Sequence, residues 1–108
     1  QVDMKYLQSC RLIFDKDGRL MAVVMTFYGN DFDYYYELLS EKYKPVESYK
    51  PFVGDKEAKF VDGDTEILLK DNFFNMTLLY ANRNFIKKVE EQTQQEKEQE
   101  RQRTKQNL

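Results

Sequence analysis

The sequence predicts an α+β domain: an antiparallel sheet in the order β-β-α-β-β-β with one packing helix, followed by a long polar C-terminal helix. Two turn signals between apolar runs, Asp15-Lys16-Asp17-Gly18 and Asp62-Gly63-Asp64, predict two hairpins, because Asp-Gly supplies the positive φ angles of tight turns. One amphipathic segment lies between the two groups of strands. Strands grouped before and after a helix are typical of the α+β class.

The 108-residue chain has room for one small domain. We divide it into an N-terminal lead-in (1–9), an α+β domain (10–82) and a polar C-terminal helix or linker (83–108). All of the phenylalanines and tyrosines precede Ile86, whereas the segment 91–108 has a single aliphatic side chain, Leu108. That segment therefore cannot contribute to a core.

The first hairpin is predicted from residues 10–14 and 20–27. On its first strand Cys10, Leu12 and Phe14 share one face, and we expect Cys10 to be a small buried apolar residue. Both faces of the second strand are apolar, which predicts a central strand or one covered on each side.

A helix is predicted from the stretch NDFDYYYELLSEKYK, with Asn30 or Asp31 as its N-cap and Pro45 ending it. Helical spacing puts a set of large residues on the packing face: Tyr35, Leu38, Leu39 and Tyr43, with Phe32 beside them. Tyr34 and Tyr36 are expected to point toward the flanks.

After this helix, residues 46–55 are predicted to form an irregular connection, because they include Pro51 and Gly54. Three strands are expected to follow, over 57–61, 65–70 and 73–82.

The C-terminal segment contains neither Gly nor Pro after Asn84, so it can be helical. Phe85, Ile86 and Val89 are expected to anchor its first turns on the sheet. Beyond them the heptad positions are polar, and a coiled-coil seam is absent. A solvent-exposed helix or linker is one interpretation; a helix that continues onward or docks on a partner is the other.

Composition excludes several functions. The chain has no histidine and one cysteine, which removes histidine-based catalysis, intramolecular disulfides and cysteine-based zinc sites. A net charge of −2 without clustered bases argues against nucleic-acid binding. No signal peptide or membrane span is visible. The tetrapeptide 7–10 ends in Cys10 like a lipoprotein processing site, but no apolar segment precedes it.

The carboxylates are explained by local structure. Asp15, Asp17 and the Asp62/Asp64/Glu66 group lack the spacing of a calcium loop, and turns already require Asp and Gly there. Acids near the helix start, such as Asp31, Asp33 and Glu37, are accounted for by capping. No phosphate-binding glycine loop occurs. We therefore predict no catalytic residue, no metal, no cofactor and no small-molecule substrate.

The surface remains as the candidate functional feature. Tyrosine suits protein interfaces because it combines apolar area with a hydroxyl that tolerates water. We predict that a protein partner or a second copy binds through a set of aromatic residues: Tyr28, Tyr34, Tyr36, Tyr49 and Phe52.

The runs LIFDKDGRLMAVVMTF, YYYELLSEKY, TEILLKD and NMTLLY together resemble small exported bacterial domains of uncharacterised function, over roughly residues 10–82. Such domains commonly carry Lys-Tyr-Gly after the helix, where this chain has Lys44, and a Trp before the fourth strand, which it lacks. The resemblance implies a periplasmic or cell-envelope location and a binding or scaffolding role.

Three functional classes follow. The first is a non-enzymatic interaction or scaffold module. The second is a small inhibitor or toxin-neutralising (immunity-type) protein, which would form a tight stoichiometric complex with an enzyme. The third is a small hydrolase, which would need acids that converge in a pocket.

Overall fold

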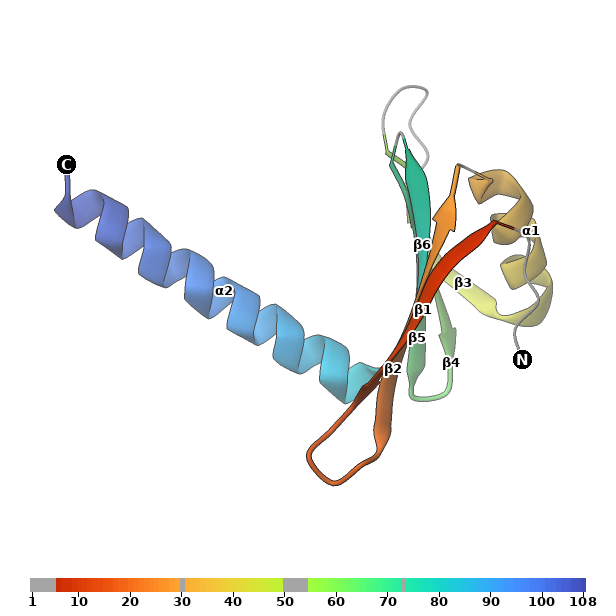
Figure 1. The fold of residues 1–108 in the computed structure, drawn as a ribbon, viewed down its shortest axis with the longest axis horizontal. Helices are drawn as coiled ribbons and strands as arrows, with labels where there is room; N and C mark the ends of the chain where they lie inside the picture. The colour runs from red at the N-terminus through yellow and green to blue at the C-terminus, as the bar shows by residue number, and fades with distance from the viewer. Residues whose placement is uncertain (1–5, 30, 50–54, 73) are drawn as a thin grey trace.

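The computed structural model describes residues 6–29, 31–49, 55–72 and 74–108, and it confirms the α+β class (Figure 1). Six antiparallel strands form one sheet in the order β1-β2-β6-β5-β4-β3. The strands are β1 (Leu7–Phe14), β2 (Leu20–Tyr28), β3 (Lys44–Tyr49), β4 (Glu57–Asp62), β5 (Thr65–Asp71) and β6 (Asn75–Asn82). The helices are α1 (Phe32–Lys42) and α2 (Arg83–Gln106).

Both predicted hairpins form. In the β1–β2 turn the Asp15 carboxylate accepts hydrogen bonds from the backbone N–H groups of Asp17 (2.8 Å) and Arg19 (2.9 Å), and Gly18 has a φ of 81°. The hydrogen bond from Arg19 is the main reason that the pKa of Asp15 lies below its usual value. Gly63 has a φ of 60° in the β4–β5 turn. These acids and glycines therefore build the turns.

Strand β3 was not predicted, because residues 46–55 were expected to be irregular. It pairs with β4 through Lys44–Tyr49, with a register shift between Pro45 and Glu47. Proline is tolerated here because β3 is an edge strand, where a missing N–H leaves no ladder bond unmade. Pro51 and Gly54, which suggested a connection, lie outside the described residues.

The core lies between α1 and one face of the sheet, which we call the helix-side face. Helix α1 contacts β4 and β5, and Phe60, Ile67 and Leu69 beneath it are fully buried. Phe27, Met76 and Leu78 extend this core onto β2 and β6. Strands β2, β4, β5 and β6 thus contribute core residues at alternate positions, as strand geometry requires.

The packing face of α1 agrees with the expected one at Phe32, Tyr35, Leu39 and Tyr43, and it differs at Leu38 and Tyr36. The residues that contact the core are spaced four, three and four apart: Phe32, Tyr36, Leu39 and Tyr43. Tyr35 is also partly buried, whereas Leu38 is 42% exposed. The prediction for Leu38 was wrong, and Tyr36 does not lie on the flank, because the sheet contacts the helical row that begins at Phe32. Asp31 occupies the N-cap position without a side-chain hydrogen bond there.

Strand β1 begins at Leu7, within the predicted lead-in, and it is the outermost strand beside β2. Its residues 8–12 are all exposed. Cys10 is among them, so the expectation of a buried cysteine was wrong. The reason is topological: α1 contacts β4 and β5, on the other side of the sheet centre, and leaves β1 uncovered beyond Leu7, which packs against the core.

Helix α2 starts directly at the end of β6 and projects away from the side of the sheet opposite α1 (Figure 1). Its first turn is tied to the sheet by Arg83, whose N–H donates to the Asp64 carbonyl (2.8 Å) and whose guanidinium lies 3.8 Å from Glu66. Asn82 caps it through the Asn84 N–H. No residue of α2 is buried, and Val89, expected to be an anchor, is 43% exposed.

Candidate functional site

Two of the predicted interaction residues, Tyr28 and Tyr34, present their rings to solvent. Tyr28 ends β2 and is 62% exposed; Tyr34 lies in the first turn of α1 and is 54% exposed. The Tyr34 ring meets Tyr35 edge-on, with centroids 5.5 Å apart, and Tyr35 in turn lies 5.1 Å from Phe27 in the core. The exposed ring of Tyr34 therefore packs against the ring of Tyr35, which the core residue Phe27 holds in place. We call Tyr28 and Tyr34 the tyrosine pair.

The other predicted residues are placed differently. Tyr36 is partly buried; its ring stacks on that of Phe32 with centroids 6.0 Å apart and makes a tilted contact with that of Phe60 at 5.5 Å. Its ring thus contributes to the core under α1, on a different side of the helix from Tyr34. Tyr49 is the last residue of β3, and its side chain is not among those described; Phe52 lies outside the described residues.

A tyrosine contact also joins the end of α1 to the sheet. Tyr43 and Tyr80 meet edge-on with centroids 6.3 Å apart. Desolvation, followed by the proximity of Tyr43, raises the pKa of Tyr80 to about 12. The neutral Tyr80 side chain packs in this partly buried place. Its ionised phenolate would be less stable there, because burial removes the water that stabilises the charge.

A second exposed surface was not predicted from the sequence. Leu12, Phe14 and Leu20, on the β1–β2 hairpin, are 55%, 54% and 50% exposed. We call them the hairpin patch. The alternation of residues on β1 predicted that Leu12 and Phe14 share one face. It did not predict that α1 leaves these two residues uncovered.

The two buried carboxylates serve the fold. Asp71 accepts the Lys56 N–H at 2.7 Å, and Asp71 donates its own N–H to the Lys56 carbonyl at 3.0 Å, so that the segment before β4 is fastened to β5. Glu66 lies 3.5 Å from Lys59 and 3.8 Å from Arg83. Among the residues described, no three acids or cysteines gather in a group that could hold a metal ion.

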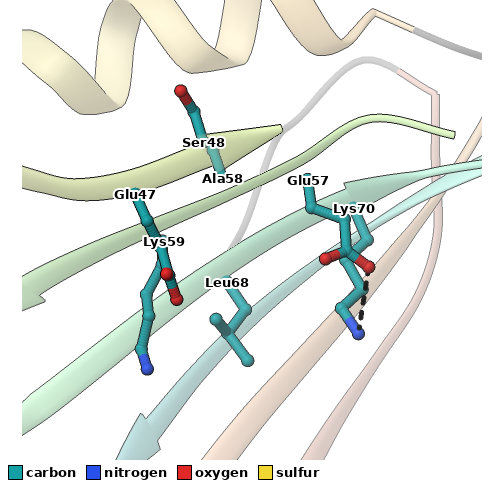
Figure 2. A pocket seen from close by; sticks show the side chains of 7 residues that line it. All are labelled: Glu47, Ser48, Glu57, Ala58, Lys59, Leu68 and Lys70. Atoms are coloured by element: carbon teal, nitrogen blue, oxygen red, sulfur yellow. Dashed lines mark ion pairs between the residues drawn. The ribbon is translucent and has the colours of Figure 1, made fainter. Parts of the chain in front are cut away.

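A shallow hollow of about 200 Å³ lies over β3, β4 and β5, and Figure 2 shows its lining. Lys59, Leu68 and Lys70 point away from α1, whereas Ser48 points toward it. Glu57 and Lys70 form an ion pair of 3.7 Å, drawn as the dashed line. The hollow is smaller than most ligand pockets, which exceed about 300 Å³. Of the two acids that line it, Glu57 is paired with Lys70, and two lysines, Lys59 and Lys70, line the hollow with them.

Neither helix in the described part of the chain is long and apolar enough to cross a membrane. The sequence and the fold were also compared with known proteins. No family model, curated protein or solved structure matches this chain.

Proposed function

We propose that this chain is a non-enzymatic protein-interaction or scaffold module. The observation that carries the proposal is the tyrosine pair, Tyr28 and Tyr34, which flanks the connection between β2 and α1 and exposes more than half of each residue. Exposed tyrosines on rigid secondary structure are well suited to binding, because they bring a large contact area at a small entropic cost.

The packing below the pair supports this role. Tyr34 rests on Tyr35, and Tyr35 contacts the core residue Phe27, so the Tyr34 ring is oriented before a partner arrives. Preorganised side chains lose little conformational freedom on binding. The partner would be a protein whose surface offers an apolar hollow for the two rings and hydrogen-bond acceptors for their hydroxyls.

For the location, we propose the bacterial cell envelope, on the strength of the resemblance of residues 10–82 to small exported domains. Fractionation of producing cells, followed by immunodetection of the chain, tests this location. Recovery in the cytoplasmic fraction alone would contradict it.

The interaction role is tested by affinity capture from the cells that produce the protein, with the mass of the intact complex measured. We expect a defined complex with wild type and a loss of at least about tenfold in partner recovery with the double variant Tyr28→Ser, Tyr34→Ser. Val46→Ser is the matched control, since Val46 is 53% exposed on the far edge of the sheet. Circular dichroism verifies that both variants fold.

The stoichiometry of the complex separates the candidate classes. A tight complex with one enzyme, whose activity falls on binding, would replace the scaffold role with the inhibitor or immunity-type role. A protein that captures nothing and stays monomeric would overturn both.

A further inference from the structure

A hollow of about 330 Å³ lies where the residue before β1 meets the connection between β2 and α1. The described residues that line it are Tyr6, Tyr28, Gly29 and Asp31. It is larger than the hollow over β3, β4 and β5, and it reaches the volume of small ligand pockets, which begin at about 300 Å³. Tyr28 of the tyrosine pair therefore belongs to a concave surface that also contains a second tyrosine and an acid.

Backbone hydrogen bonds fix the residues around this hollow. The N–H of Tyr28 donates to the Tyr6 carbonyl at 2.9 Å, and the N–H of Gly29 donates to the Phe74 carbonyl at 3.2 Å. Tyr6 has a φ of 66°, a conformation that a residue with a side chain adopts only at a cost in free energy. Both tyrosines are 62% exposed. The two side chains are therefore presented to solvent from a backbone that is set before a partner binds.

The acid of the hollow is not used by the fold. Asp31 occupies the N-cap position of α1, but its side chain makes no capping hydrogen bond. Among the described residues no ion pair involves Asp31, whereas Asp33, in the first turn of the same helix, lies 3.6 Å from Lys56. The described lining also contains no basic side chain. The Asp31 carboxylate is therefore available to a group from another molecule.

We propose that this hollow binds the guanidinium group of an arginine side chain of the protein partner. The inference deepens the proposed interaction role and rests on it. The lining selects the charge of the occupant: Asp31 would repel an anion, and an apolar group would remove water from the carboxylate without pairing it. A guanidinium, in contrast, can form an ion pair with the carboxylate and stack on a tyrosine ring.

The shape of the occupant follows from the same groups. A guanidinium is planar and weakly hydrated, so that it stacks on an aromatic face and offers parallel N–H groups to a carboxylate, whereas the ammonium of lysine is compact and strongly hydrated. Tyr34 does not line the hollow. The two residues of the tyrosine pair therefore have different roles, Tyr28 in contact with the arginine and Tyr34 in contact with the apolar surface of the partner beside it.

Titration of the isotope-labelled full chain with Nα-acetyl-arginine amide, followed by NMR, tests the site. We expect the backbone signals of Gly29 and Asp31 to shift, with a dissociation constant on the order of 1–10 mM for so small a probe. Nα-acetyl-citrulline amide is the matched neutral probe, because it has nearly the same shape without the charge. It should bind at least about fivefold more weakly.

Two variants locate the binding. Asp31→Asn and Tyr28→Ser should each weaken binding of the arginine probe at least about threefold. The matched controls are Asp33→Asn, at an acid that is paired with Lys56, and Tyr34→Ser, at an exposed tyrosine outside the hollow. Both controls should bind the probe like wild type. Circular dichroism verifies that the variants fold, and asparagine keeps the size of Asp31 and suits an N-cap.

Equal binding of the arginine and citrulline probes overturns the inference, as does an Asp33→Asn variant that is as defective as Asp31→Asn. A lysine probe that binds as tightly as the arginine probe would overturn the choice of a guanidinium. If Tyr28→Ser fails to fold, Asp31→Asn and the citrulline probe still decide. Affinity capture that depends on Tyr28 and Tyr34 but is unchanged by Asp31→Asn would leave the interaction role standing while this inference falls.

Discussion

The two helices show how differently a helix can be stabilised in one small protein. Helix α1 has 11 residues and buries Phe32 and Leu39 against the sheet, while α2 has 24 residues and buries none. α1 depends on its tertiary contacts, because a helix of its length is marginal alone in water. α2 is fixed at its first turn by Arg83 and Asn82; Phe85 and Ile86 are half-buried, and the residues after them are exposed to solvent.

The spacing of apolar residues along each helix, and not the length of the helix, therefore determines how much of it is buried. In α1, large residues recur at four- and three-residue spacing along the side that meets β4 and β5. In α2 the pattern ends at Val89, and the following residues are polar or charged. Stability should therefore be concentrated in the shorter helix.

The largest effect that tests this comparison is expected from Leu39→Ala. Leu39 is 6% exposed, and truncation should lower the free energy of unfolding by about 2–5 kcal/mol, because the side chain leaves a cavity in the core. Leu38→Ala is the matched control on the same helix: Leu38 is 42% exposed, and its loss should cost about 0.5 kcal/mol or less. Urea unfolding measures both.

Equal losses for the two variants would show that α1 packs through the face expected from the sequence and not through the row that begins at Phe32.

Leu38 and Leu39 also illustrate how much of the fold could be predicted from the sequence. The hairpins were predictable because Asp15, Gly18 and Gly63 act within their own turns. In the packing row of α1, Phe32, Leu39 and Tyr43 were predicted. Tyr36 was not, because a helix with large residues on several sides does not by itself show which of them the sheet contacts.

The missed features share a cause in strand order. Nothing in the pattern of β1 says that it lies at an edge, so the exposure of Cys10 and Leu12 could not be foreseen. Similarly, Pro45 suggested that regular structure ends, whereas an edge strand accommodates it. For the candidate site, the sequence predicted Tyr28 and Tyr34, which are exposed in the structure; it placed Tyr36 with them because the helix orientation was unknown.

A smaller, pH-dependent effect is expected at the contact that joins α1 to β6. The pKa of Tyr80 is raised from its ordinary value of 10.0 to about 12 in the folded protein. Between these values the unfolded chain releases the proton and the folded chain keeps it. The resulting stability is therefore complete below pH 10 and is lost as the pH rises toward 12.

Replacing Tyr80 by phenylalanine removes this titration. Urea unfolding at pH 8 and at pH 10.5 should show a smaller loss of stability with pH for Tyr80→Phe than for wild type. The pH 8 comparison is the internal control, because it isolates the cost of losing the hydroxyl beside Tyr43. Parallel losses in both proteins would mean that Tyr80 does not titrate differently in the two states.

The smallest effect is expected from shortening α2. Deletion of residues 92–108 removes only exposed residues, so the free energy of unfolding should change by no more than about 0.5 kcal/mol. Deletion from residue 83 also removes Arg83, which binds the Asp64 carbonyl and lies beside the buried Glu66, and it should cost more because Glu66 loses a partner. Thermal unfolding compares the two truncations. A large loss of unfolding free energy on deletion of residues 92–108 would show that the outer part of α2 stabilises the rest of the protein. The two helices would then not differ in the way proposed.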